Sequence, residues 1–425
     1  MIAFSNGETT MTLSRRRFVQ GAAGLGAAAV SSPYVMAQTS GEIRIGLLAD
    51  KTGPVASGGI DMERGMMMFF EERNYNMAGL KVNLISVDCA SNPTTTRAKA
   101  QELFEKDRVH CYIGPLAAFE ALAIQDYIKE KEVPTLSVAA AEDMTQRQAM
   151  PWFVRATSTS SQSAHALADY CAKELGYKRM ITIGSDTAYG QEMCAGFQRV
   201  FEDNGGKIIQ KLWPTLVAPD YSTFIAQINT KADAIFSAFE GSNGFRFTRQ
   251  FVEYGLKDQL PIVGGMTHLD EAVLRNMGDE ALGTITACWY SAELDNPINK
   301  AFAPAFRKKY SYDPGFYAAA TYTNGAVLET AVKSINGKID DKNAFMNALR
   351  NVKADTCRGP VSFDEYGNVV GNVYIRKVTR VEGRLVNSII KIYPNVSQFW
   401  TYDPKEFLKN PVYSRDYPPA RYLEK

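Results

Sequence analysis

The sequence lacks an excess of charge of either sign. It contains 47 lysine and arginine residues and 46 aspartate and glutamate residues, which gives a formal net charge of +1, and no run of basic residues follows the N-terminal region. A nucleic-acid-binding face must neutralise phosphates with lysine and arginine, so this balance argues against a nucleic acid partner. The 45% hydrophobic and 22% charged residues are typical of a globular protein rather than a disordered or membrane-embedded chain.

Groups that carry acid–base and metal chemistry are also scarce. Only three histidines are present, and the chain has no His-x-x-His, His-Glu-x-x-His or Gly-x-Ser-x-Gly motif. His110 and His165 fall in predicted structural elements, whereas His268 falls in a loop where it could contact a ligand. Carboxylates such as Glu240 have no visible paired partner for general acid–base catalysis. We therefore predict that the chain is not an enzyme and that it needs no catalytic residue, metal or cofactor.

The six cysteines do not form the close-set pairs of a zinc site or a redox motif. Their spacing assigns no disulfide, even in an oxidising compartment, and we expect most of them to be buried thiols. The stretch Gly241-Ser242-Asn243-Gly244 lacks the Lys-Ser/Thr pair that completes a phosphate-binding loop. The sequence thus gives no sign of a metal, redox or nucleotide site.

The N-terminus has the organisation of a signal peptide. Arginines at 15–17 precede an apolar run over residues 21–30, and Val35-Met36-Ala37 offers residues that a signal peptidase reads. The paired arginines and the weak, Gly/Ala-rich run are similar to the twin-arginine class, which exports folded proteins. A membrane anchor needs about twenty apolar residues, so we predict that residues 1–37 are cleaved and that the mature chain is periplasmic.

From Ile43 onwards the chain alternates between strand-like and helix-like segments. Short apolar runs are followed by longer segments with apolar residues at helical spacing, and Asn92-Pro93 offers a cap and a first-turn proline for one helix. Such alternation predicts a parallel sheet covered by helices on both faces. The expected strands cover residues 43–48, 80–87, 109–113 and 133–138, and the expected helices cover 59–74, 92–107 and 117–131.

The same alternation restarts after Arg155-Ala156-Thr157 and predicts a second lobe. We expect a strand near residues 285–289 to return the chain to the first lobe, and residues 369–377 and 386–392 to form a late β-hairpin. A C-terminal stretch rich in Tyr and Pro is expected to wrap the surface. The predicted boundaries are 42–155 and 287–364 for lobe 1, 157–285 and 366–395 for lobe 2, and 396–425 for the tail.

Ligands of open parallel sheets bind at the carboxyl ends of the strands, where loops and helix N-termini converge. In this sequence those loops carry small and aromatic residues with few charges. They predict a concave, mostly apolar pocket with a few polar groups. The loops cover residues 52–59, 115–119, 139–142, 186–189, 239–241, 266–268 and 289–290.

Seven short segments follow one another in an order shared with a known family. They are Gly53-Pro54-Val55-Ala56, Tyr112-Ile113-Gly114-Pro115, Val154-Arg155-Ala156-Thr157, Tyr189-Gly190, Asp220-Tyr221-Ser222, Ala320-Thr321-Tyr322 and Gly359-Pro360-Val361-Ser362-Phe363-Asp364. Over residues 42–391 the chain resembles the periplasmic solute-binding proteins of the branched-chain amino acid (Leu/Ile/Val-binding) type. The resemblance implies an α/β type I periplasmic binding fold, with two doubly wound parallel-sheet lobes joined by three crossovers. It also implies a non-catalytic monomer that delivers a small-molecule ligand to the membrane permease of an ABC importer.

Several ligand positions of the amino-acid-binding members carry different residues here. Those members hold the ligand carboxylate with a hydroxyl after the third strand, where this chain has Ala118. They also use a Thr after the fourth strand, where it has Ala140 or Ala141. Met266 replaces the acid that pairs with the ligand ammonium, and Gly58 replaces the aromatic of the first loop.

Three other wall positions are informative. Tyr189 and Tyr317 keep aromatic side chains, whereas Glu240 stands where the family usually has a further aromatic. Glu240 could face solvent, hydrogen-bond a ligand hydroxyl or amide, or pair with an ammonium group, and in the last case an amino acid would again fit.

These differences bear on the nature of the ligand. A buried ammonium group without a carboxylate partner would cost several kcal/mol, so an ordinary α-amino acid is disfavoured. We expect a small organic acid without an amino group, with an aromatic carboxylate as one candidate, held by backbone N–H groups of the helix that opens at Ala117. An amino acid, an amide, or a ligand-sensing receptor role remain alternatives. The candidate ligand-binding residues are Ser57, Gly58, Ala117, Ala118, Phe119, Ala139, Ala140, Ala141, Tyr189, Glu240, Met266, His268, Trp289, Tyr290 and Tyr317.

Overall fold

The computed structural model describes residues 41–424. The predicted signal peptide, residues 1–37, and its cleavage site therefore lie outside the described residues, as does residue 425. From Gly41 onwards the chain is built on two β-sheets. None of the helices in that part of the chain combines the length and the apolar character needed to cross a membrane.

The first sheet contains six strands and carries helices from two distant parts of the sequence. The strands are β1 (Glu42–Ala49), β2 (Asn76–Met77), β3 (Leu80–Asp88), β4 (Cys111–Ile113), β5 (Thr135–Ser137) and β6 (Phe153–Arg155), and the helices are α1 (Ala56–Glu71), α2 (Pro93–Glu105), α3 (Ala118–Lys131) and α10 (Phe316–Ser334). Their order in the sheet is β2-β3-β1-β4-β5-β6. Every neighbouring pair is parallel except β2 and β3, which confirms the predicted parallel sheet.

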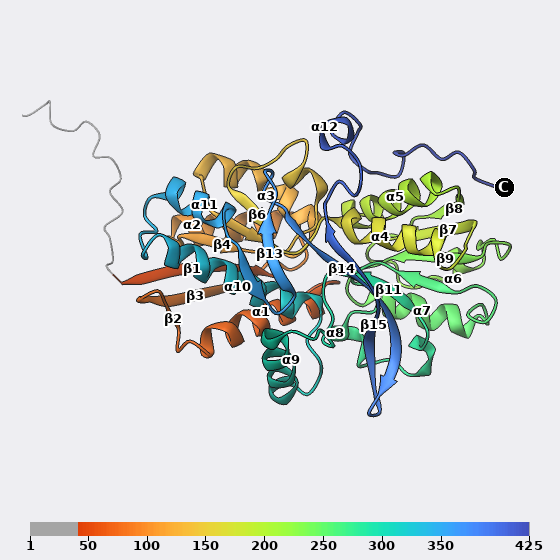
Figure 1. The fold of residues 1–425 in the computed structure, drawn as a ribbon, viewed down its shortest axis with the longest axis horizontal. Coiled ribbons are helices and arrows are strands. Elements are labelled where there is room, and N and C mark those ends of the chain that lie inside the picture. Colours follow the sequence, from red (N-terminus) through yellow and green to blue (C-terminus); the bar gives the residue numbers. More distant parts are fainter. Residues whose placement is uncertain (1–40, 425) are drawn as a thin grey trace, which may run out of the picture. The chain divides into compact units, whose positions relative to one another are not determined.

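The second sheet combines a parallel half with an antiparallel half. Its strands are β7 (Arg179–Gly184), β8 (Lys207–Leu212), β9 (Ala234–Ala238), β10 (Ile262–Gly264), β11 (Ile285–Cys288), β12 (Ala354–Thr356), β13 (Gly359–Phe363), β14 (Val369–Val381) and β15 (Arg384–Val396). The strands β8, β7, β9, β10 and β11 are parallel neighbours in that order. The hairpin β14–β15 continues the sheet in antiparallel pairing beside β11, which confirms the predicted late hairpin (Figure 1).

The predicted return of residues 285–289 to the first lobe is wrong. Strand β11 pairs with β10 on one side and with β14 on the other, so it lies inside the second sheet. Ala287 and Cys288 are fully buried there, and Arg376 of β14 donates a hydrogen bond to the Thr286 hydroxyl at 3.2 Å. An apolar strand buried on both faces looks the same in sequence whichever sheet it joins, so the pattern alone did not assign it.

The remaining helices connect or cover these strands. They are α4 (Ser160–Lys173), α5 (Ala188–Asp203), α6 (Ser222–Ile225), α7 (Asn243–Glu253), α8 (Glu271–Leu274), α9 (Pro297–Tyr310), α11 (Lys342–Arg350) and α12 (Pro404–Phe407), with short 3₁₀ turns at Glu142–Thr145 and Asp279–Ala281. Helix α2 begins as predicted, because the Asn92 side chain accepts the Thr94 and Thr95 N–H groups. All six cysteines are buried free thiols, which confirms that expectation.

Close packing of α1 against α10 sets the position of one wall of the site. A Cβ atom on Gly65 of α1 would lie 2.1 Å from the carbonyl oxygen of Ala318 in α10, so the two backbones approach more closely than a side chain would allow. Two turns earlier, a Cβ atom on Gly58 would lie 2.8 Å from the ring of Tyr317. These glycines therefore let the N-terminal turn of α10 lie directly against α1.

The C-terminal segment, residues 397–424, runs over the rest of the fold and is drawn in dark blue in Figure 1. Phe407 and Tyr413 are buried in a cluster with Ala195 of α5. Arg147, which precedes β6, donates hydrogen bonds to the carbonyl oxygens of Asn410 and Pro411 at 2.6 and 3.0 Å. The segment thus contacts both the chain that enters the first sheet and a helix of the second, as a surface-wrapping tail would.

Candidate functional site

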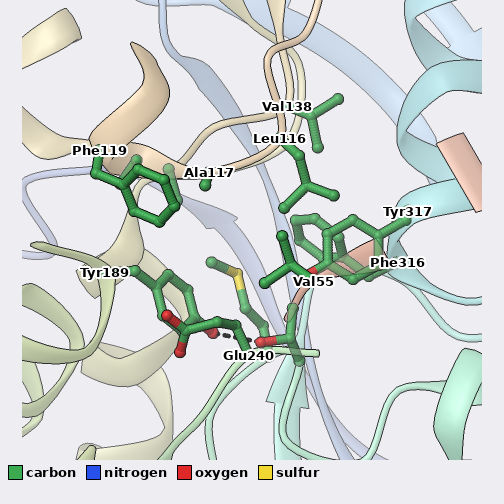
Figure 2. A pocket seen from close by; sticks show the side chains of 13 residues that line it. Val55, Leu116, Ala117, Phe119, Val138, Tyr189, Glu240, Phe316 and Tyr317 are labelled. Carbon is green, nitrogen blue, oxygen red and sulfur yellow. Dashed lines mark hydrogen bonds between the residues drawn. The ribbon is translucent and has the colours of Figure 1, made fainter. Parts of the chain in front are cut away.

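A cavity lies where loops at the carboxyl ends of strands from both sheets meet (Figure 2). It encloses about 390 Å³ of empty space, including the part open to solvent. The lining is largely apolar, with a small number of polar groups, as is usual for small-molecule sites. The lining residues are Val55, Leu116, Ala117, Ala118, Phe119, Val138, Ala140, Tyr189, Glu240, Met266, Thr267, Phe316 and Tyr317.

One side of the cavity is the N-terminus of α3. Ala117 is the N-cap residue, with extended backbone, and the helix begins at Ala118. The N–H groups of Ala118 and Phe119, at the first two helical positions, have no intrahelical partner, and the helix dipole makes this end electropositive. Because Ala117 and Ala118 have only methyl side chains, a ligand group can approach these N–H groups closely. The arrangement suits an anionic group.

The buried Glu120 carboxyl caps this helix end. It accepts hydrogen bonds from the Ala117 N–H at 3.1 Å and from the Thr96 hydroxyl at 2.9 Å. Burial, followed by the neighbouring Asp50 carboxylate, raises the pKa of Glu120 to about 9. The raised pKa favours the protonated form of Glu120, which adds no negative charge at the helix end.

Aromatic rings form the side walls. Tyr189, in the first turn of α5, and Phe316 and Tyr317, in the first turn of α10, are all buried. The rings of Phe316 and Tyr317 meet edge to face with centroids 4.9 Å apart. Together with Phe119 they surround the space between Ala117 and the opposite side of the cavity (Figure 2). Flat apolar walls of this kind fit a planar ring.

The side opposite Ala117 is polar, and Glu240 lies there (Figure 2). Thr187 donates a hydrogen bond to Glu240 Oε1 at 3.1 Å, while Oε2 has no hydrogen-bond partner among the described residues. Burial raises the pKa of Glu240 to about 7, an effect opposed by the hydroxyls of Ser185 and Thr187. Nearby, the hydroxyls of Tyr189 and Thr267 are hydrogen-bonded at 2.7 Å.

Eight of the residues chosen from the sequence line this cavity. Five further lining residues were missed, although four of them lie within or directly beside the strand-end loops that were chosen, and the fifth, Phe316, is the sequence neighbour of Tyr317. Their position within or beside these loops could have indicated them. The eight are Ala117, Ala118, Phe119, Ala140, Tyr189, Glu240, Met266 and Tyr317, and the five are Val55, Leu116, Val138, Thr267 and Phe316.

Three predicted residues have side chains engaged outside the lining. The ring of His268 lies between the hydroxyls of Ser237 and Thr248, at 3.0 and 3.1 Å, and burial lowers its pKa to about 3. The Tyr290 hydroxyl donates to an Asn299 side chain at 2.7 Å. Trp289 packs behind Phe316, with ring centroids 5.0 Å apart. We therefore assign these three side chains to packing around the site rather than to its surface.

Four small predicted residues also lie outside the lining. Gly58 is behind the Tyr317 ring. The carbonyl oxygens of Ala139 and Ala141 accept hydrogen bonds from the buried Arg155 guanidinium, at 3.1 and 2.7 Å, which fixes the loop after β5. Ser57 lies in the first turn of α1 and is not among the lining residues. Within residues 41–424, no group of three or more His, Cys, Asp or Glu side chains is placed to hold a metal ion.

A hydrogen bond beside the cavity joins loops of the two sheets. Asp270, in the segment after β10, accepts the backbone N–H of Phe316 with its Oδ1 atom and that of Ala272 with its Oδ2 atom. Phe316 itself and Thr267, three residues before Asp270, both line the cavity.

Comparison with known proteins places the fold. A sequence model described as "Periplasmic binding protein" matches residues 42–383. A solute binding protein of an ABC transporter from Rhodopseudomonas palustris BisB5, solved in complex with 3,4-dihydroxy benzoic acid, is 32% identical with a TM-score of 0.80, covering 84% of this chain and 98% of that one. A second solute binding protein, from Rhodopseudomonas palustris HaA2 in complex with p-hydroxybenzoic acid, is 27% identical with a TM-score of 0.79 and the same coverage. Leu/Ile/Val-binding protein homolog 6 of Brucella abortus is 27% identical over 379 residues, which cover 87% of this chain and 96% of that protein.

Proposed function

The chain belongs to the periplasmic binding protein family, and we propose that it is the substrate-binding component of an ABC importer whose ligand is a small organic acid, best matched by an aromatic carboxylate. The observation that carries the proposal is the composition of the cavity. It combines a helix N-terminus lined by alanines, whose Ala118 and Phe119 N–H groups have no intrahelical partner, with buried aromatic walls. Met266 also stands where the amino-acid-binding members have the acid that pairs with the ligand ammonium.

The carboxylate of the ligand would bind at α3. The N–H groups of Ala118 and Phe119 would donate to it, and the protonated Glu120 would add no repulsion. Ala118 and Ala140 leave room for a ligand group where a hydroxyl-bearing side chain would stand in an amino-acid binder. The aromatic ring would then lie between Tyr189 and the pair Phe316–Tyr317.

Likeness to proteins whose solved complexes hold hydroxybenzoic acids supports this ligand class. Likeness to a Leu/Ile/Val-binding protein homolog supports the alternative, an amino acid or amide. In that alternative Glu240 would pair with the ligand ammonium, because it is the buried carboxyl on the polar side of the cavity. The placement of Glu240 on the side of the cavity opposite Ala117 disfavours this (Figure 2), since the two charged groups of an α-amino acid share one carbon atom.

The proposed setting follows from the same family. The predicted signal peptide, residues 1–37, would export the chain to the periplasm, where it would close on its ligand as a monomer and deliver it to a membrane permease. The ligand would leave unchanged. A product accumulating from any bound compound would contradict this role.

Calorimetric titration of the purified protein tests the ligand class. We expect binding heat with benzoate and 4-hydroxycinnamate and none with leucine or phenylalanine. Small-angle scattering should show a decrease in the radius of gyration when a binding acid is added. Heat from the amino acids alone would refute the carboxylate proposal and favour the Glu240–ammonium alternative.

A further inference from the structure

Apart from Ser185, whose hydroxyl lies near Glu240 without a hydrogen-bond partner among the described residues, the hydroxyl groups on the polar side of the cavity have acceptors for their protons. Thr267 donates to the carbonyl oxygen of Phe239 at 3.0 Å, and a carbonyl can only accept. The hydrogen bond between Tyr189 and Thr267, at 2.7 Å, must therefore be donated by Tyr189. Thr187 in turn donates to Glu240 Oε1. Each of these three hydroxyl protons is engaged within the protein.

What this side offers to a ligand is therefore acceptor capacity. The oxygen of Tyr189 keeps a free lone pair, and Oε2 of Glu240 has no hydrogen-bond partner among residues 41–424. Glu240 is only 7% exposed, so water does not readily supply the missing donor. A buried acceptor without a donor is costly, and a ligand that brings a donor removes that cost.

The opposite side of the cavity has the reverse character. At the N-terminus of α3 the backbone presents N–H donors and no acceptor. Figure 2 shows Ala117 and Glu240 on opposite sides, with Val55 and Tyr189 between them. A ligand that satisfies both sides carries an anionic acceptor at one end and a hydrogen-bond donor at the other.

We propose that Glu240 is the specificity-determining residue for a hydroxyl group at the end of the ligand opposite its carboxylate, so that the site selects para-hydroxylated aromatic acids over their unsubstituted parents. This inference rests on the proposed function, since it assumes an aromatic acid whose carboxylate lies at α3. It adds the orientation of that acid in the cavity. It also names the residue that recognises the hydroxyl group opposite the carboxylate.

Three ligands separate the effect of the hydroxyl proton on affinity from the effects of substituent size and ring electronics. Benzoate lacks the substituent, 4-fluorobenzoate carries a substituent of similar size without a proton, and 4-hydroxybenzoate carries the donor. By calorimetry of the wild-type protein, we expect 4-hydroxybenzoate to bind at least about tenfold more tightly than either of the others. The fluoro compound should be the weakest, because its fluorine faces acceptors.

The variant Glu240→Met keeps side-chain length and removes the acceptor. Above pH 7 the substitution also removes a negative charge and so changes the affinity for every acid, which makes the ratio between 4-hydroxybenzoate and benzoate the quantity to compare. We expect that ratio to fall to about one. The control Asp186→Asn removes a carboxylate one residue from Thr187 that does not line the cavity, and it should leave the ratio at its wild-type value.

Each possible result of these measurements either supports or overturns the inference about Glu240. A wild-type ratio near one overturns the inference while leaving aromatic-acid binding intact, and so does a ratio that survives in Glu240→Met. Binding of leucine with no binding of any benzoate overturns both the inference and the proposed function. A melting curve would reveal whether Glu240→Met fails to fold. In that case, the comparison of 4-hydroxybenzoate with 4-fluorobenzoate on the wild-type protein still decides whether the site recognises a hydrogen-bond donor on the ligand.

Discussion

The carboxylate of Asp270 accepts a hydrogen bond from the backbone N–H of Phe316, with 2.6 Å between oxygen and nitrogen. Asp270 follows a strand of the second sheet, whereas Phe316 begins the helix that packs on α1 beside the first sheet. A carboxylate at a helix N-terminus satisfies a free N–H group and interacts favourably with the helix dipole. The contact therefore stabilises the arrangement of the loops that enclose the cavity.

The variant Asp270→Asn should weaken ligand binding. Both carboxylate oxygens of Asp270 accept backbone N–H groups, and an amide can replace only one of them. We expect the form in which the loops enclose the cavity to lose about 1–2 kcal/mol of stabilisation. Calorimetry should then show roughly a five- to thirtyfold lower affinity. Asp341→Asn, at the exposed N-cap of α11, is the matched control and should not change ligand affinity.

The variant Tyr189→Ala should reduce the affinity for an aromatic acid by about 1–3 kcal/mol, because it removes a buried ring from the cavity wall. Tyr254→Ala removes a ring that is 53% exposed and should have no effect. Isothermal titration calorimetry measures the ligand affinity of both variants. If Tyr189→Ala and Tyr254→Ala bind the acid equally tightly, Tyr189 is not part of the binding site.

Glu240 should make the free energy of unfolding depend on pH. Its pKa is raised to about 7 in the folded protein, from about 4.5 when unfolded, so the folded state binds more protons between these values. This stability is fully present below pH 4.5 and is lost as the pH rises to about 7, by an amount up to about 3 kcal/mol.

Urea unfolding of ligand-free protein at pH 5 and pH 8 measures this dependence. Asp61 and Glu271 also have raised pKa values, about 7 and about 8, so the wild-type protein loses stability for several reasons as the pH rises. The informative comparison is with Glu240→Gln, which should lose less stability between the two pH values. An identical loss in both proteins would show that the Glu240 pKa is not raised.

The tail should contribute to stability through its buried rings. Phe407 is 2% exposed and packs against Phe399 and Tyr413, so Phe407→Ala should cost about 3 kcal/mol. Tyr422→Ala removes a tail ring that is 39% exposed and should change the unfolding free energy by less than about 0.5 kcal/mol. Equal melting temperatures for the two variants would contradict a structural role for the Phe407 ring.

Local patterns were sufficient for much of the fold. The cap at Asn92, the strand–helix alternation and the β14–β15 hairpin each depend on residues close in sequence, and the structure has all three. The sheet that β11 joins depends instead on pairing with β14, some ninety residues later, as in Thr286 with Arg376. No periodicity within β11 carries that information.

The candidate site could also be predicted only in part from the sequence. Strand-end loops could be chosen from the sequence, and they supply most of the lining, because parallel strands bring their carboxyl ends together. Which side chain of a loop faces the cavity depends on distant partners. His268 is held by Ser237 and Thr248, and Tyr290 by Asn299. Such contacts are visible only after the chain has folded.

The tail has a consequence for the order of events during synthesis. Tyr413 is buried, and its hydroxyl lies 3.2 Å from the ring nitrogen of His165, nearly 250 residues earlier in the chain. The cluster around α5 therefore stays incomplete until residue 413 has left the ribosome. Until then, the apolar surface of α5 that Phe407 and Tyr413 cover in the folded protein stays exposed.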